Sequence, residues 1–159
     1  MRRVIFLSIV LVLSLLLTAG PAAAVPPERG SFSFSEEGVD PAGTTCAFPV
    51  HFSQTEYGSF KVFFDQNGDF DRAVLHINYD ATISANGHML VERDTFTRTI
   101  NADGTMRDAG LTTHIQGPGG VVLRDAGLIV YSDTEETVAY VRGPHPQLSG
   151  ESFCPALGG

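Results

Sequence analysis

The stretch from Thr105 to Tyr131 reads TMRDAGLTTHIQGPGGVVLRDAGLIVY, and it contains nearly the same phrase twice. Arg-Asp-Ala-Gly-Leu follows Met106 in the first copy and Leu123 in the second. Between the copies lies Gly117–Gly120, Gly-Pro-Gly-Gly, which favours a turn and does not easily continue a strand. The repeat therefore predicts an antiparallel hairpin.

The expected register of this hairpin pairs two glycines. If the residues that flank the loop face each other, Gly110 lies opposite Gly127 and Thr112 lies opposite Asp125. Two glycines that face each other across a ladder mark a bend, or a place where another group approaches the backbone closely. The glycine pair is thus a first candidate for a ligand contact.

The start of the chain is typical of a secretory precursor. Arg2 and Arg3 precede an apolar run from Val4 to Leu17, and small residues then lead to Ala24. The run is too short to span about 30 Å of hydrocarbon comfortably, which favours a cleaved signal peptide over a retained anchor. We expect residues 1–24 to be the signal peptide and the mature protein to be secreted and extracellular.

The mature chain is acidic and has the length of one domain. Residues 25–30 are expected to form a flexible N-terminus and 31–159 a single domain. The whole chain has 10 basic and 18 acidic residues, and loss of the two leader arginines changes its net charge from −8 to −10. Phosphate backbones and anionic lipids repel such a chain, so we expect no nucleic-acid partner and no membrane contact after signal removal.

Cys46 and Cys154 are the two cysteines of the chain. In an oxidising compartment, two thiols usually form one disulfide, and this one would enclose most of the domain. A reactive thiol or a metal site is the alternative, but no ligand residues lie at short spacing from either cysteine. We expect a structural Cys46–Cys154 bridge.

Segments with strand character follow one another at hairpin spacing and predict an all-β fold with little or no helix. The segment that begins at Phe70 either continues to Ser84 or bends near Asp80 and becomes two strands. The expected strands are 31–35, 46–53, 57–65, 70–79, 89–100, the two hairpin strands and 137–142.

Short connections make neighbours in sequence pair in space, which predicts an antiparallel meander of about eight strands. Such a meander can remove its edges by closing into an up-and-down barrel, and an even strand count would place both cysteines at one end. A β-sandwich is the alternative fold.

Charged residues inside the strands are the candidate ligand contacts. Glu92, Asp94 and Arg98 share one parity with Leu90 and Phe96, so a barrel interior could contain all of them. The alternative is an outward face that carries a few exposed apolar residues. The candidate ligand-binding residues are Glu92, Arg98, His114, Asp125, Gly110 and Gly127.

Several chemistries lack their motifs. Alternating Asp65, Asn67, Asp69 and Asp71 resemble the start of a calcium loop, but Phe70 stands where the loop needs glycine, so a solvated hairpin tip is favoured. The five histidines are scattered, without zinc spacing. The chain has no Gly-x-Ser-x-Gly elbow, His-Glu-x-x-His helix, P-loop or dinucleotide fingerprint. We assign no catalytic residue, metal or cofactor.

The leader, the phrase Cys46 to Val50, the glycine-punctuated strands, the repeated Arg-Asp-Ala-Gly and the late Cys154 together resemble a group of small exported bacterial proteins of unknown function. That resemblance implies secretion and an all-β fold, and it assigns no site residue. The strand layout is also similar to lipocalin-like barrels and to barrels of the allene-oxide-cyclase and dirigent type. This likeness concerns the fold, which does not determine function.

Three classes of function are left open by the sequence. The first is a secreted barrel that binds a small apolar or amphipathic ligand. The second is an extracellular or cell-envelope module that binds another protein through a sheet edge or a surface patch. The third is a small isomerase or cyclase that uses strand charges as acid and base.

Overall fold

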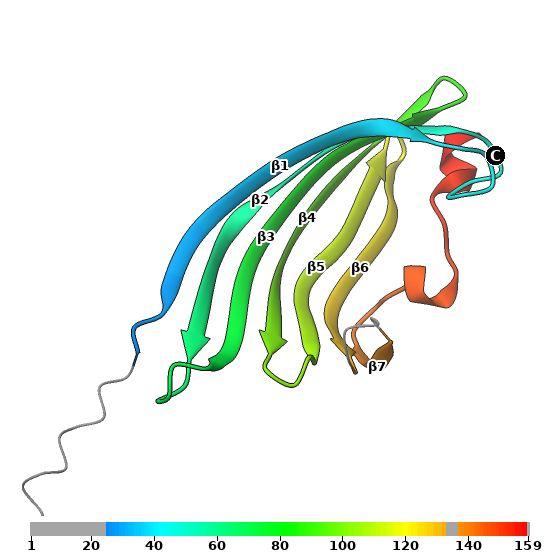
Figure 1. Cartoon of the computed structure of the whole chain (residues 1–159). Helices are drawn as coiled ribbons and strands as arrows, with labels where there is room; N and C mark the ends of the chain where they lie inside the picture. Colours follow the sequence, from blue (N-terminus) through cyan, green and yellow to red (C-terminus); the bar gives the residue numbers. More distant parts are fainter. Residues whose placement is uncertain (1–24, 133–136, 159) are drawn as a thin grey trace, which may run out of the picture.

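The computed structural model describes residues 25–132 and 137–158. The expected signal peptide, residues 1–24, lies outside the described residues. Within them, a single antiparallel sheet contains seven strands in sequence order (Figure 1). The strands are β1 (Glu28–Asp40), β2 (Val50–Phe64), β3 (Phe70–Ala85), β4 (His88–Asn101), β5 (Met106–Gly117), β6 (Gly120–Tyr131) and β7 (Val138–Arg142).

The sheet has seven strands and not the expected eight, because the expected strands 46–53 and 57–65 form one continuous strand, β2. Strand β2 runs without a break through Gln54, which lies between the expected strands 46–53 and 57–65, and that residue pairs with Glu36 on one side and Ala81 on the other. Strand β3 is likewise continuous through Asp80. Ladder bonds on both sides of each strand therefore override the weak strand preference of their polar residues.

The expected all-β class and meander are confirmed. The only helices among the described residues are two short 3-10 turns, η1 (Gln147–Ser149) and η2 (Cys154–Leu157). Neither is long or apolar enough to cross a membrane. Short hairpin connections explain the meander, because they leave each strand no partner nearer than the next one.

The β5–β6 hairpin forms where the repeat predicted it, with one correction to its register. Gly110 lies opposite Gly127 as expected, but Asp125 faces Thr113, not Thr112. Thr112 is an extra residue on β5, which makes a β-bulge, and the ladder shifts back before the loop. The expected Thr112–Asp125 pair was therefore wrong, because a uniform register cannot include the bulge.

The sheet is open, so closure into a barrel is not observed. Strands β1 and β7 are its two edges, and they do not pair with each other. Strand β7 has only five residues, all exposed, and Gly143-Pro144 follows it, where proline cannot donate to a ladder. A two-sheet sandwich is not observed either, because every described strand belongs to this one sheet.

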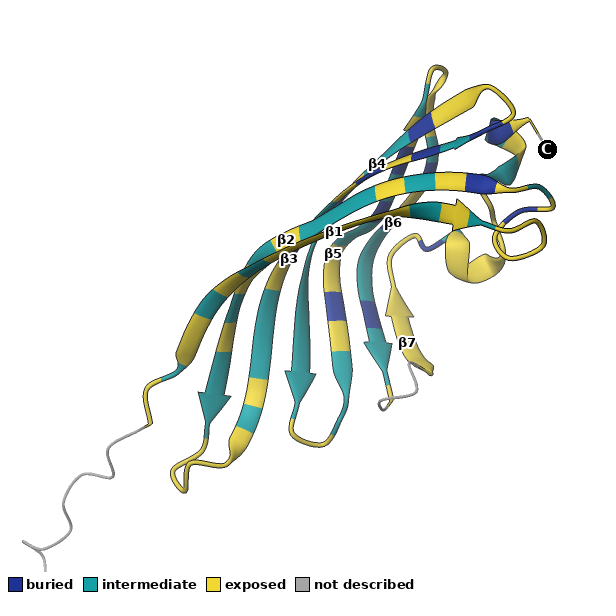
Figure 2. Ribbon diagram, turned by 45° about the horizontal axis from the view of Figure 1, so that its top comes forward, coloured by how far each residue is buried: buried dark blue, intermediate teal, exposed yellow. Residues whose placement is uncertain are grey.

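The sheet curls into a trough, and the C-terminal segment lies along one of its rims (Figures 1 and 2). This segment takes the place of a longer β7. Its Pro144 carbonyl accepts a hydrogen bond of 2.9 Å from the Ala126 N–H on β6. The chain then continues to η2 at one end of the trough, which we call the capped end.

The expected disulfide is confirmed at the capped end. Cys46, in the loop between β1 and β2, is bonded to Cys154 in η2, with the two Cα atoms 5.7 Å apart. Six strands, β2 to β7, separate the two cysteines in the chain. Because that number is even, the chain returns to the end of the sheet where Cys46 lies, without any need for a closed barrel.

The hydrophobic core also lies at the capped end. Figure 2 shows most of the buried residues near η2, whose Leu157 is fully buried. Apolar residues from the inner face of the sheet pack around the disulfide there. The buried core consists of Cys46, Val50, Ile83, Ala85, Leu90, Ile115, Leu123 and Leu157.

Candidate functional site

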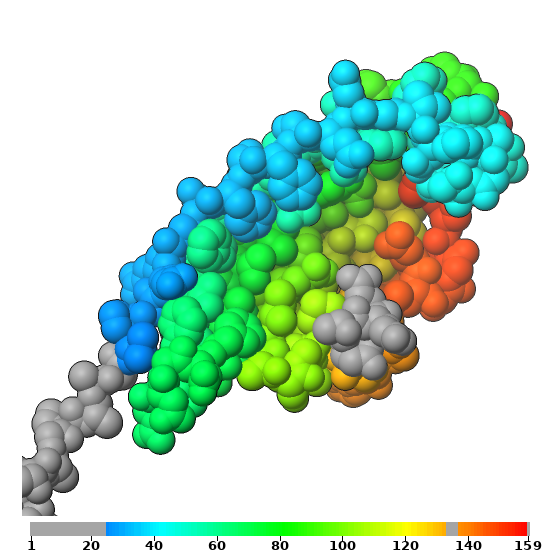
Figure 3. Space-filling view, in the orientation of Figure 1, coloured from blue at the N-terminus to red at the C-terminus, as the bar shows by residue number. Residues whose placement is uncertain are grey.

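The concave face of the sheet contains the residues that share parity with Leu90, which is 1% exposed. On β4 this face includes Glu92, Asp94, Phe96 and Arg98, so the expected grouping of these charges with apolar residues is correct. Because Leu90 belongs to the buried core, the face that contains it is the inner face of the sheet. In Figure 3 the floor of the trough, green to yellow, lies between blue β1 and the orange-red C-terminal segment.

A pocket of about 250 Å³ opens on this face beside the capped end. Its walls are mostly apolar or aromatic, and its polar groups come from four neighbouring strands and the loop after β1. The lining residues are Asp40, Thr45, Val50, Phe52, Gln54, Tyr79, Ala81, Ile83, Glu92 and Phe153. Apolar walls with a few convergent polar groups are typical of small-molecule sites.

A chain of hydrogen bonds crosses the floor of the pocket. The Tyr79 hydroxyl donates to Gln54 Oε1 over 2.5 Å, and Gln54 Nε2 donates to Glu36 Oε2 over 3.3 Å. Burial raises the pKa of Tyr79 to about 12, and the neighbouring Glu92 and Asp94 carboxyls add to this. Tyr79 therefore keeps its proton at neutral pH and acts in the pocket as a hydrogen-bonding group.

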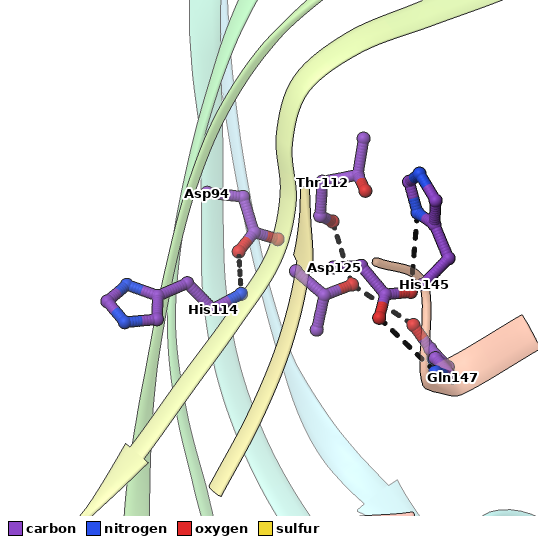
Figure 4. Close-up of polar contacts among 7 residues, drawn as sticks. Asp94, Thr112, His114, Asp125, His145 and Gln147 are labelled. Atoms are coloured by element: carbon purple, nitrogen blue, oxygen red, sulfur yellow. Dashed lines mark hydrogen bonds and ion pairs between the residues drawn. The ribbon is translucent and has the colours of Figure 1, made fainter. Parts of the chain in front are cut away.

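Glu92 and Asp94 lie two residues apart on one face of β4, and their carboxyl groups interact. Asp94 is 6% exposed, and its Oδ1 accepts the backbone N–H of His114 over 2.7 Å (Figure 4). Burial, reinforced by the charge of Glu92, raises the pKa of Asp94 from 3.8 to about 8. Burial also raises the pKa of Glu92. The pair thus retains a proton at neutral pH.

A second buried cluster attaches the C-terminal segment to β6. Asp125 Oδ1 accepts the Gln147 N–H over 3.2 Å, and its Oδ2 lies 4.0 Å from His145 Nδ1 (Figure 4). The Gln147 side chain in turn accepts a bond of 3.0 Å from the Thr113 hydroxyl. Asp125 and His145 are both buried, so this cluster holds the segment in place and does not line the pocket.

Of the six candidate residues predicted from the sequence, Glu92 alone lines the pocket. Arg98 lies on the concave face, where it forms two hydrogen bonds of 2.8 and 2.7 Å to buried Asp108. The His114 ring points away from the Asp125 cluster, and its Nε2 lies 3.1 Å from the Gln116 side-chain amide. Asp125 belongs to the second buried cluster, and the structure does not bring the candidate residues together at one site.

Gly110 and Gly127 allow the backbone of a neighbouring strand to approach closely. A Cβ at Gly110 would lie 2.7 Å from the Thr95 carbonyl oxygen, and one at Gly127 would lie 2.1 Å from that of Arg142. Both glycines have a φ that side chains rarely adopt, +136° and +137°. The expected close approach therefore occurs, and the approaching group is protein backbone.

Most residues of the pocket, including Phe52, Gln54 and Tyr79, are not among the candidates predicted from the sequence. A usable signal existed in the Asn86-Gly87 turn, where both φ angles are positive. A two-residue turn of this type fixes the β3–β4 register, which puts Tyr79 opposite Asp94. The contribution of the loop after β1 depends on the disulfide and on the curl of the sheet.

The acidic hairpin tip after β2 is exposed to solvent, as the sequence favoured. Asp65 Oδ1 accepts the N–H groups of Asn67 and Asp69 over 2.8 and 3.0 Å, and these bonds lower its pKa. The described residues contain no cluster of three or more His, Cys, Asp or Glu placed to hold a metal ion.

No protein-family model, curated protein or solved structure matches this chain. The residues of the pocket are therefore the basis for a functional proposal.

Proposed function

We propose that this protein is an extracellular binding protein whose concave face holds a small amphipathic molecule in the pocket at the capped end. The observation that carries the proposal is the pocket itself. It combines apolar and aromatic walls with the polar groups of Gln54, Tyr79 and Glu92. Such a lining suits a molecule with an apolar body and one polar group.

The volume limits the size of the ligand. Pockets for drug-sized molecules enclose about 300 to 1,000 Å³, and this one encloses about 250 Å³. A ligand of one ring or one short alkyl chain fits it better than a long-chain lipid. The disulfide-linked loop after β1 supplies Thr45 and begins next to Asp40, so the bridge supports one wall of the site.

Export agrees with the chemistry of the described residues. The Cys46–Cys154 bridge is of the kind that persists in oxidising compartments, and neither described helix can span a membrane. The apolar run that precedes Ala24 is the basis for proposing secretion.

A second candidate function is acid-base catalysis, favoured by one observation. The proton held by Glu92 and Asp94 lies beside the pocket, where a carboxyl group with a raised pKa can serve as a general acid. An isomerase or cyclase would need this pair for turnover. A binding protein would need it for affinity alone.

Binding can be tested with the neutral one-ring dye 4-(dimethylamino)benzonitrile, whose fluorescence depends on polarity, and a variant that fills the pocket. Ala81 lines the pocket and is 5% exposed, so Ala81→Leu adds three carbon atoms to its floor. Thr82→Leu is the control, because Thr82 is exposed on the opposite face of β3. We expect Ala81→Leu to weaken dye binding at least 10-fold and Thr82→Leu to leave it unchanged.

Two results would contradict the proposal. One is equal dye binding by the wild type and Ala81→Leu, with both folded by circular dichroism. The other is the absence of any dye binding by the disulfide-bonded protein. Native mass spectrometry of the secreted protein offers an independent check, since a retained small molecule would appear as a mass shift.

A further inference from the structure

The concave face has an unbalanced charge. Of the described strand residues whose parity places them on this face, Arg98 is the only Lys or Arg, and it is bonded to Asp108. Carboxyl groups on this face come from five strands. They are Glu28, Glu36, Asp40, Glu56, Glu92, Asp94, Asp108 and Asp125.

The pocket has the same imbalance in a smaller space. Its charged lining residues are Asp40 and Glu92, and the described residues that line it include no Lys, Arg or His. A concave surface of one sign with apolar walls concentrates ions of the opposite sign. An anionic ligand would approach two carboxylates without any cation to compensate it.

The aromatic side chains that line the pocket also favour a ligand with a positive charge. Phe52, Tyr79 and Phe153 all border the pocket. Aromatic faces attract organic cations because the face of the ring carries partial negative charge. The apolar walls would then receive the remaining carbon atoms of the ligand.

The proton that Glu92 and Asp94 hold lies where the positive charge of a ligand would be stabilised. Glu92 and Asp94 lie on one face of β4, where their carboxyl groups interact, and Glu92 borders the pocket. The titratable groups that interact with the pair include Tyr79 on β3 and Asp125 on β6. Glu56 on β2 and Glu36 on β1 act in turn on Tyr79.

We infer that the ligand is a small organic cation, a protonated amine on an aromatic or alkyl body, that binds beside Glu92 and displaces the proton held by Glu92 and Asp94. This inference rests on the proposed binding function and names its ligand class. The ammonium group forms an ion pair with the carboxylate, and the displaced proton passes to the buffer. Charge is therefore conserved without any further reactant.

The first test compares ligands of one shape and different charge. Phenethylamine, 2-phenylethanol and phenylacetate share one ring and a short side chain, and octylamine, octanol and octanoate form a second series. We expect each amine to bind at least 10-fold more tightly than its alcohol, and each carboxylate to bind most weakly. Isothermal titration calorimetry on the disulfide-bonded wild type measures all six affinities.

The outcomes separate this inference from the function on which it rests. If the alcohols or carboxylates bind as well as the amines, the ligand is not a cation, and the binding function stands. If no member of either series binds, and the one-ring dye does not bind, the binding function itself fails.

The second test measures the proton. Titrations of phenethylamine in buffers of different ionisation enthalpy report the number of protons released, and we expect on the order of one per ligand near pH 7. Asp94→Asn keeps an acceptor for the His114 N–H and holds no titrating proton, so its release should fall close to zero.

Two matched variants test whether the ammonium group of the ligand binds beside Glu92. Glu92→Gln should weaken amine binding at least 10-fold and leave alcohol binding unchanged. Glu37→Gln is the control, since Glu37 is exposed on the opposite face of β1 from Glu36. Unchanged amine binding by Glu92→Gln would overturn the inference, as would wild-type binding without proton release.

The pH dependence of amine affinity can be measured on the wild type alone, so this test does not depend on whether a variant folds. Amine affinity should rise between about pH 6 and about pH 8, because fewer pairs then hold a proton that must be displaced. Alcohol affinity should stay constant over this range. A flat amine profile would contradict the displacement of a proton.

Discussion

Asp94 on β4 accepts a hydrogen bond of 2.7 Å from the backbone N–H of His114 on β5. The bond lies where the β4–β5 ladder changes register, because β5 has one more residue than β4 between the ladder pairs on either side. The N–H would otherwise be an unpaired donor at a bulge. A buried carboxyl group beside the pocket thus completes the hydrogen bonding of the distorted ladder.

Stability should depend on pH through Asp94. Its pKa is about 8 in the folded protein and near 3.8 in the unfolded chain, so between these values the folded state holds the extra proton. The free energy of unfolding should therefore fall as pH rises from about 4 to about 8, by at most about 1.4 kcal/mol per pH unit for this group. Urea titrations at several pH values measure the slope.

Asp94→Asn isolates this contribution. The variant should remove most of the slope and be more stable than the wild type above about pH 8, where the wild type has an ionised buried carboxylate. Glu37→Gln, a similar change at an exposed position, should leave the slope unchanged. A slope that persists in Asp94→Asn would show that another group is responsible.

The pair of Arg98 and Asp108 should be the costliest ion pair to break on the concave face. The Asp108 side chain is 4% exposed and that of Arg98 is 30% exposed, and two hydrogen bonds join them. Arg98→Gln leaves a buried carboxylate without its cation, and we expect a loss of about 2 to 3 kcal/mol. Chemical denaturation at neutral pH measures it.

The exposed pair of Arg93 and Asp80 is the control. Its closest N–O distance is 3.7 Å, and its side chains are 74% and 49% exposed. Arg93→Gln should cost less than about 0.5 kcal/mol, because water screens this pair. Equal losses in Arg98→Gln and Arg93→Gln would contradict the importance of burial.

Gly127 should tolerate no side chain. A Cβ there would lie 2.1 Å from the Arg142 carbonyl oxygen, and its φ is +137°. We expect Gly127→Ala to lower the free energy of unfolding by at least about 2 kcal/mol, because backbone must move. Gly119→Ala is the control, since nothing lies within 4 Å of its Cβ and its φ is unstrained. A change within about 0.5 kcal/mol is expected there.

Loss of the disulfide should destabilise both the fold and the pocket. The bridge spans 108 residues of sequence, and removal of a native bridge costs about 2 to 5 kcal/mol. The double variant Cys46→Ser, Cys154→Ser should lose stability in that range and bind the one-ring dye more weakly, because Asp40 and Thr45 lie in or next to the linked loop. Unchanged dye binding by the folded double variant would show that the loop is not needed for the site.

The sequence by itself determined the all-β class, the meander, the β5–β6 hairpin and the pairing of its two cysteines. These properties are local, since turn residues and period-two alternation act over a few positions, and two cysteines allow one intramolecular bridge. The register expected from the turn correctly predicted the pairing of Gly110 with Gly127, because the two register shifts between this pair and the loop cancel.

Only the tertiary structure decided which face is inside and what lies on it. Alternation is symmetric, so it grouped Glu92 with Leu90 and could not say that their common face points into the trough. A bulge at Thr112 also changed the partner of Asp125, because one extra residue shifts the pairs from Thr113 to Ile115, before the ladder returns to its first register. The pocket combines Asp40, Tyr79 and Phe153 from distant parts of the chain, and only the curl of the sheet and the disulfide bring these residues together.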